Sequence, residues 1–386
     1  MRVSPKRSLV FFDDRYHEVY GAQENLLLLG SLCAAEGHRC RFMTSAEGEL
    51  VQAALARGLA CEVVPAPPQL RTFERGTIRG GVGNRWRSLR AWSSYVRRVD
   101  RALEADRPDV VVAGSVRSVM HLTRSALRRR GPAIVLYAQN STPFGFFAAL
   151  AALVSDRILL IAPGAARTFP PGVLRVLASR VRLLPSGRDV DRYSVDRPHH
   201  GGSADRPVAI VTVGSVTRRK GLHVLVEALA AVGRPCTLSV VGGTSGSASE
   251  RYRDEIQAQA DRLGVELILL GWRDDVVPFL ERADLFALAS FDEGLPGVLL
   301  EAMAAGLPCV TTNAGGSGDL VREAGCGLSV AIDDADALAA ALRLLIDDPA
   351  GRDRMGAAGR HHVEQEYSLT AYRRRFDAIL TELLDA

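Results

Sequence analysis

The sequence predicts an α/β protein built from two Rossmann-like domains. The chain has 386 residues, which exceeds one ordinary hydrophobic core, so two domains are expected. Short apolar runs of strand length alternate with helical patterns in both halves, as they do in parallel βαβ units. A polar, linker-like stretch at 199–207 separates the two series. Two such domains facing a cleft would hold a ligand at the carboxyl ends of their strands.

The first series predicts a domain over residues 1–195. A strand is expected at 9–12, a helical pattern begins near Gly21 and stops at Gly37, and a second strand follows at 40–43. Further apolar runs predict strands at 109–113, 133–137, 157–161 and 181–184.

The second series predicts a domain over residues 196–368. Its strands are expected at 208–213, 237–241, 266–270 and 285–287, with helices between them.

The composition is that of a soluble globular protein, with 47% hydrophobic and 24% charged residues. Six cysteines are scattered without any CxxC, which indicates reduced core thiols and neither a disulfide framework nor a zinc site. No signal peptide and no apolar run of ~18 residues is visible, so a cytoplasmic protein is expected.

Charge is distributed unevenly along the chain. Residues 1–200 carry 30 basic and 17 acidic side chains, a net of +13, and residues 201–386 carry a net of −9. This asymmetry predicts an anionic partner for the first half. The segment 71–130 holds 15 arginines, with Trp86, Trp92 and Tyr95 among them. An interfacial helix on anionic lipid has this pattern, and so does an ordinary solvated helix whose aromatic residues face the core.

Two carboxylates, Glu293 and Glu301, lie eight positions apart around a Gly/Pro turn that begins a predicted helix. The first N–H groups of that helix, at Gly297, Val298 and Leu299, would form an anion site, and the glycine lets a phosphate come close. A carboxylate one turn deeper can accept hydrogen bonds from a ribose. The spacing suits a nucleotide whose phosphate carries a further polar group, although a surface helix with solvated glutamates remains the alternative.

A glycine and a cationic cluster follow the first strand of the second domain. Gly214 and Ser215 come at the strand end, and Arg218, Arg219 and Lys220 precede a helix. Such a loop suits a diphosphate, which needs neutralisation of charge and close approach of the backbone; a solvated basic turn is the alternative. Lys220 is one of two lysines among 48 basic residues, an excess of arginine that indicates a GC-rich genome, for instance a bacterial one.

The carboxylate element closely resembles the Glu-x7-Glu element of glycosyltransferase family 4, the retaining enzymes of the GT-B fold. The resemblance continues through 308–316, and Asp319 stands where many members carry Glu. The basic loop resembles the family's Gly-Arg-x4-Lys-Gly loop, in which Lys220 matches the lysine. Ser215 replaces the usual arginine, so Arg218 or Arg219 would have to supply the second cation.

Weaker matches extend the resemblance to most of the chain. Trp272 and Arg273 resemble the loop beside the nucleotide base, and Gly242 ends a strand facing the same cleft. Gly21 lies in the family's glycine-rich turn, although it also fits a plain helix start. The segment 184–189 resembles the hinge between domains, with Ser186 in place of Asn. In such relatives the last helix, here within 369–386, can cross back to the first domain.

One position departs from the family. Many relatives have a histidine near the transferred sugar, and Gln139 aligns with it. Gln139 or Asn140 could hydrogen-bond a sugar hydroxyl, although neither can act as a base. His121 is expected to be a core or surface histidine.

The resemblance implies a retaining, metal-independent glycosyltransferase without a cofactor. Its donor would be a nucleoside diphosphate sugar, with uridine or guanosine as the favoured base. Lys220 and Arg218 or Arg219 would bind the diphosphate with the helix amides, Glu301 the ribose, and Glu293, beside Gly294, the donor sugar. The acceptor hydroxyl could belong to a lipid-linked glycan, a polysaccharide or a secondary metabolite; no nucleic acid partner is expected.

Two other classes of function are compatible with parts of the sequence. A catalytically silent homologue acting as a binding or scaffolding subunit is suggested by Gln139 and Ser215, and opposed by the intact carboxylate pair and Lys220. A nicotinamide dehydrogenase is disfavoured because no GxGxxG follows the first strand of either domain.

Overall fold

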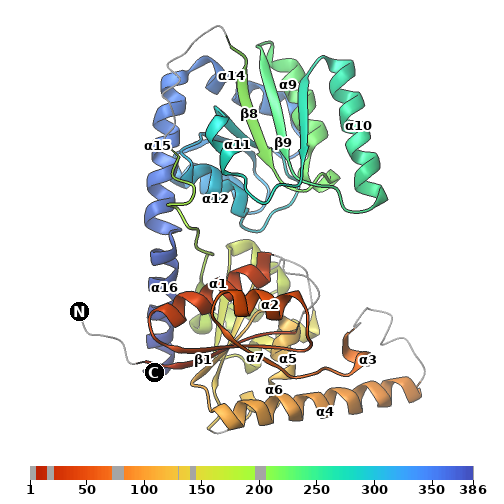
Figure 1. The fold of residues 1–386 in the computed structure, drawn as a ribbon, viewed down its shortest axis with the longest axis vertical. Helices are drawn as coiled ribbons and strands as arrows, with labels where there is room; N and C mark the ends of the chain where they lie inside the picture. Colours follow the sequence, from red (N-terminus) through yellow and green to blue (C-terminus); the bar gives the residue numbers. More distant parts are fainter. Residues whose placement is uncertain are drawn as a thin grey trace. The chain divides into compact units, whose positions relative to one another are not determined.

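A computed structural model describes residues 6–14, 21–71, 82–128, 130–139, 145–195 and 206–385 (Figure 1). It divides into two compact units, one of Met1–Ser186 with Arg373–Ala386, the other of Gly187–Tyr372. The division precedes the boundary expected at residue 195, because the segment after Gly187 packs into the second unit. Tyr193 belongs to the hydrophobic core of that unit, and Val190 and Val195 pack against it.

The first unit contains a parallel sheet with the strand order β3-β2-β1-β4-β5-β6-β7. Its strands are β1 (Ser8–Asp13), β2 (Arg39–Thr44), β3 (Ala60–Val63), β4 (Val110–Ala113), β5 (Ala133–Ala138), β6 (Arg157–Leu160) and β7 (Val181–Leu183). The central strands β1 and β4 are buried along their whole length, as expected for a parallel sheet covered by helices on both faces.

Helices and short 3₁₀ turns connect these strands. The α-helices are α1 (Gly21–Ala35), α2 (Glu49–Ala56), α3 (Pro68–Arg71), α4 (Val82–Asp106), α5 (Val116–His121), α6 (Thr123–Ala126), α7 (Phe146–Val154) and α8 (Val173–Val176). The 3₁₀ turns are η2 (Pro163–Thr168) and η3 (Ala178–Arg180). The last helix, α16 (Leu369–Leu384), begins in the second unit, and its residues from Arg373 onward belong to the first.

The second unit contains a parallel sheet with the strand order β10-β9-β8-β11-β12-β13. Its strands are β8 (Val208–Val213), β9 (Cys236–Val241), β10 (Glu266–Gly271), β11 (Leu285–Leu288), β12 (Cys309–Thr312) and β13 (Gly327–Val330). Its helices are η4 (Arg218–Lys220), α9 (Leu222–Val232), α10 (Ser247–Leu263), α11 (Val277–Arg282), α12 (Gly297–Ala304), α13 (Ser317–Ala324), α14 (Ala335–Asp347) and α15 (Pro349–Glu366).

In both sheets the order in which the chain adds strands reverses at one place. In the first unit the chain builds outward from β1 to β3 and then restarts on the other side of β1 with β4. In the second unit it does the same between β8 and β11. At such a topological switch point the loops after two neighbouring strands diverge, which leaves space for a ligand at the carboxyl edge of the sheet.

The prediction of two parallel α/β domains is therefore confirmed. The six cysteines are free thiols. Within the described residues, no helix has both the length and the apolar composition needed to cross a membrane.

Candidate donor site at the carboxyl edge of the second sheet

Lys220 and Glu293 meet at the switch point between β8 and β11. Lys220 Nζ lies 2.5 Å from Glu293 Oε1, and Ser290 Oγ donates to the same oxygen at 2.7 Å. The Glu293 side chain is 9% exposed and that of Lys220 13%. Two residues separated by 73 positions thus form a partly buried ion pair where the topology predicts a ligand.

Glycines allow the loops of this site to approach one another. A Cβ on Gly242 would lie 1.9 Å from the carbonyl oxygen of Gly214, and one on Gly221 would lie 1.9 Å from that of Ala289. Gly221 also adopts φ +64°, in the left-handed region, immediately after Lys220. These close backbone contacts fix the position from which Lys220 reaches Glu293.

The two arginines beside Lys220 point in different directions. Arg219 Nη1 donates to the Asp292 carbonyl at 2.7 Å and lies 3.5 Å from Glu293 Oε2. Arg218 instead pairs with Glu255 at 2.5 Å, and its guanidinium stacks over the Tyr252 ring. Of the two candidate second cations, Arg219 is therefore the one that lies beside the carboxylate.

Helix α12 begins next to this pair. The Leu299 amide already donates to the Pro296 carbonyl at 3.1 Å, whereas the amides of Gly297 and Val298 have no acceptor among the described residues. Gly315, with φ +58°, packs against the loop before the helix, since a Cβ there would lie 1.7 Å from the Glu293 carbonyl oxygen. The unpaired amides at the start of α12 can bind an anion.

Glu301 lies inside α12 and is covered by the segment that follows β7. Its Oε1 lies 3.4 Å from Arg188 Nε, and Tyr193 hydrogen-bonds to it. Burial raises the pKa of Glu301, an effect that the charges of Arg188 and Arg192 and the tyrosine bond only partly offset. Burial, together with the negative charge of Glu301, raises the pKa of Tyr193 to about 12.

Arg188 is a site residue that the sequence did not reveal. Its Nη2 lies where a side chain on Gly297 would begin, 1.9 Å from an ideal Cβ. The guanidinium therefore lies against the first turn of α12 as well as near Glu301. The sequence offers one signal for it, since Arg188 directly follows Gly187 in the segment that resembles the hinge.

Trp272 presents an aromatic surface at the same edge of the sheet. It follows β10, its side chain is 74% exposed, and its Nε1 donates to Asp274 at 3.2 Å. A Cβ on Gly243 would lie 3.4 Å from the Trp272 Cβ, so the loops after β9 and β10 lie in contact. Arg273 is exposed next to it.

Residues 198–362 match the family model described as glycosyl transferases group 1. The lipopolysaccharide core biosynthesis glycosyltransferase LpsE of Rhizobium meliloti is 34% identical over 184 residues, 47% of this chain and 50% of LpsE. The GDP-mannose-dependent monoacylated alpha-(1-6)-phosphatidylinositol monomannoside mannosyltransferase of Corynebacterium glutamicum is 34% identical over 216 residues, 51% of this chain and 55% of that enzyme. The chain thus spans about half the length of these curated relatives.

Solved structures extend the similarity to both units. The crystal structure of Anabaena HepE in complex with UDP matches 97% of this chain and 100% of its own, with a TM-score of 0.78 and 18% identity. The chain has the GT-B fold. The family model and both curated relatives are those of glycosyltransferases.

In the first unit of this GT-B chain, Gln139 is engaged in structural contacts. It follows β5, its Nε2 donates to the Ala22 carbonyl at 2.9 Å, and its Oε1 accepts from Asn25 Nδ2 at 3.0 Å. Gly21 is the first residue of α1, so these bonds attach the start of that helix to the end of β5. Asn140 lies outside the described residues.

Proposed function

We propose that this protein is a retaining, metal-independent glycosyltransferase of family 4 that transfers a sugar from a nucleoside diphosphate to an acceptor hydroxyl. The observation that carries the proposal is the Lys220–Glu293 pair at the switch point of the second sheet. In this pair Lys220 is a cation that can stabilise the leaving diphosphate, and Glu293 is a carboxylate that can face the sugar. The free amides at the start of α12, which can bind phosphate, lie beside them.

The groups that line the candidate site take separate roles in this proposal. Lys220 and Arg219 bind the diphosphate together with the first amides of α12, and Glu301 accepts hydrogen bonds from the ribose. Trp272 offers its ring to the base. Glu293 faces the donor sugar, where its negative charge stabilises the cationic character that develops at the anomeric carbon.

Transfer with retention requires no side chain of the protein to act as a general base. The acceptor hydroxyl forms its bond to the anomeric carbon on the face from which the diphosphate leaves, and a diphosphate oxygen takes the hydroxyl proton. The chain then supplies positioning and charge stabilisation. Gln139 fits this scheme as a residue that positions α1, since both ends of its amide are engaged.

The names of the similar proteins favour two bases for the donor nucleotide and one class of acceptor. HepE was crystallised with UDP, and the Corynebacterium enzyme is named as dependent on GDP-mannose. We therefore propose uridine or guanosine as the base. LpsE is named for lipopolysaccharide core synthesis, which favours a glycan or lipid-linked acceptor. A silent scaffolding homologue is not favoured, because the ion pair and the free amides are both in place.

Nucleoside diphosphates are expected to stabilise the protein against heat. A ligand at ~100 times its dissociation constant adds ~2.7 kcal/mol to the free energy of unfolding. The measurement is the melting temperature with uridine, guanosine, adenosine and thymidine diphosphates and their sugars, with nicotinamide dinucleotide as the control. A clear rise with one base and none with the control supports the proposal, and no rise with any nucleotide contradicts it.

We further propose that the protein works in the cytoplasm, which its six free thiols favour, and that it contacts anionic membrane through α4. This helix exposes Trp86 and Leu89 beside Arg87 and Arg90. An interfacial helix presents such apolar and basic side chains together.

Flotation with vesicles that contain phosphatidylglycerol tests the membrane contact. Each basic residue near an anionic surface contributes about 1 kcal/mol, so the Arg87→Glu, Arg90→Glu double variant should bind at least ~30-fold more weakly. The control is Arg251→Glu with Arg253→Glu, two exposed arginines on α10. Unchanged flotation of the α4 variant would exclude this contact.

A further inference from the structure

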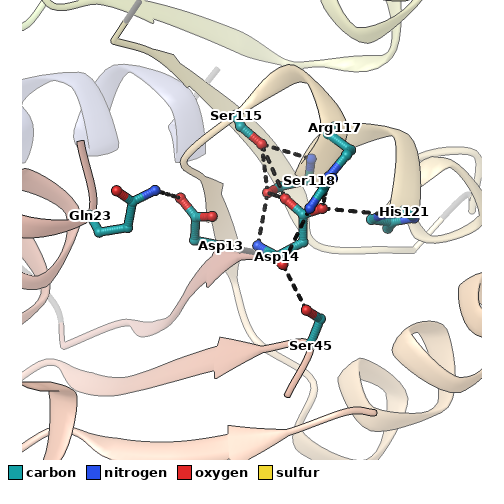
Figure 2. Close-up of polar contacts among 8 residues, drawn as sticks. All are labelled: Asp13, Asp14, Gln23, Ser45, Ser115, Arg117, Ser118 and His121. Carbon is teal, nitrogen blue, oxygen red and sulfur yellow. Dashed lines mark hydrogen bonds and ion pairs between the residues drawn. The ribbon is translucent and has the colours of Figure 1, made fainter. Parts of the chain in front are cut away.

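The first unit has a charged cluster at its own switch point, between β1 and β4 (Figure 2). Asp14 directly follows β1, and the other members lie on or just before the short helix after β4. We call this set the Asp14 cluster; it consists of Asp14, Ser115, Arg117, Ser118 and His121. Nothing in the donor chemistry proposed above uses it.

Asp14 holds the cluster together. Its side chain is 3% exposed, its Oδ1 accepts from Ser118 Oγ at 3.0 Å, and its Oδ2 accepts from Arg117 Nε. Burial alone would raise the pKa of Asp14, but the bond to His121 and the charge of Arg117 outweigh it and hold the pKa below its usual range. Asp14 is therefore a buried carboxylate anion whose oxygens already accept hydrogen bonds from Ser118, Arg117 and His121.

Arg117 is the member of the cluster that can meet a ligand. Its side chain is 29% exposed, and its Nε and Nη2 face Asp14. Its Nη1 has no hydrogen-bond partner among the described residues. A guanidinium fixed along one edge offers the other edge as a rigid fork of two N–H donors, which matches a phosphate or carboxylate.

Neither Asp13 nor Asp14 presents an unpaired negative charge to such a ligand. Asp13 is fully buried, and Gln23 Nε2 donates to it at 3.2 Å. Asp14 is neutralised by Arg117 itself. The first half of the sequence is basic, with a net charge of +13 over residues 1–200.

Two buried polar atoms, one in the cluster and one on its neighbour Tyr95, are left without partners among the described residues. They are His121 Nδ1 and the Tyr95 hydroxyl, whose rings meet edge to face at a centroid distance of 4.9 Å. Buried polar atoms in folded proteins are nearly always hydrogen-bonded. These two atoms add polar groups to the buried side of the cluster, behind the exposed part of Arg117.

The two units thus place an ion pair at equivalent positions. In the second unit Lys220 follows β8 and Glu293 follows β11, whereas in the first Asp14 follows β1 and Arg117 follows β4. We propose that Arg117, positioned by Asp14, binds a phosphate group carried by the second substrate of the reaction. Its place in the reaction rests on the proposed transferase function, whereas binding of phosphate by Arg117 does not.

Protection of Arg117 from phenylglyoxal, mapped by peptide mass spectrometry on the full-length protein, tests the proposal. The second unit is first saturated with the nucleoside diphosphate that gives the largest thermal shift. Inorganic phosphate and methyl phosphate are then added separately. At ~10 times the dissociation constant, phosphate should slow modification of Arg117 about tenfold. Arg124 is the matched control, because it too pairs with a buried aspartate, Asp100, at 2.8 Å.

Selective protection of Arg117 by both phosphates supports the site. Equal protection of Arg124, no protection, or equal protection by uncharged glucose would overturn it. A calorimetric titration of Arg117→Lys with methyl phosphate complements the mapping, since lysine keeps the charge and loses the fork. At least about tenfold weaker binding, against no change for Arg124→Lys, is expected, and unchanged binding would refute the role of the fork. Because the nucleotide thermal shift is measured independently, the donor site can stand if this site fails.

Discussion

Glu293→Gln is expected to lower turnover at least ~100-fold while nucleotide binding and folding are retained. The substitution keeps the size of the side chain, and the amide oxygen can still accept from Lys220 and Ser290. It removes the negative charge that faces the donor sugar in the proposed site. The measurement is kcat for release of nucleoside diphosphate from the donor that the thermal-shift experiment selects.

Glu364→Gln is the matched control for this variant. Glu364 pairs with Arg360 at 3.0 Å on the surface of α15, so its replacement also removes one paired carboxylate from the second unit. Its kcat should stay at the wild-type value. If Glu293→Gln turned over as fast as this control, Glu293 could not be the catalytic carboxylate.

Lys220→Met is expected to lower kcat/KM for the donor by about 10³-fold, which is about 4 kcal/mol of transition-state stabilisation. The lysine places a cation 2.5 Å from Glu293 Oε1, and the leaving diphosphate gains negative charge as the reaction proceeds. Arg219 is 3.5 Å from the other carboxylate oxygen and retains part of the positive charge. Steady-state kinetics with the selected donor give the value.

Lys6→Met serves as the control, because Lys6 is the other lysine of the chain and lies exposed in the first unit. It should leave kcat/KM unchanged. A fall of less than about threefold in Lys220→Met, equivalent to under ~1 kcal/mol, would show that the diphosphate binds elsewhere.

The residues of the candidate donor site could be proposed from the sequence because they belong to short local motifs. Glu293 and Glu301 flank the start of one helix, and Lys220 lies in one loop after a strand, so each can be recognised from the local sequence. The meeting of Lys220 and Glu293 follows from the parallel topology, which brings the ends of β8 and β11 together. The two-domain fold was also predictable from local sequence, since buried parallel strands appear as continuous apolar runs.

Other features depend on tertiary contacts that no local pattern displays. The approach of Arg188 to Gly297 joins positions more than a hundred residues apart, and the difference between Arg218 and Arg219 depends on Glu255 and Tyr252 of α10. The strands β3 and β13 at the edges of the two sheets have no apolar run to predict them, because each is four residues long and none of those residues is fully buried. The Asp14 cluster likewise becomes visible only when β1 and β4 are adjacent.

The most direct test of the donor site is a crystal structure of the protein with the nucleoside diphosphate that gives the largest thermal shift. The proposal predicts that the diphosphate lies within hydrogen-bond distance of Lys220 Nζ and of the first amides of α12, with the ribose against Glu301. A diphosphate bound anywhere other than this edge of the second sheet would contradict the proposal.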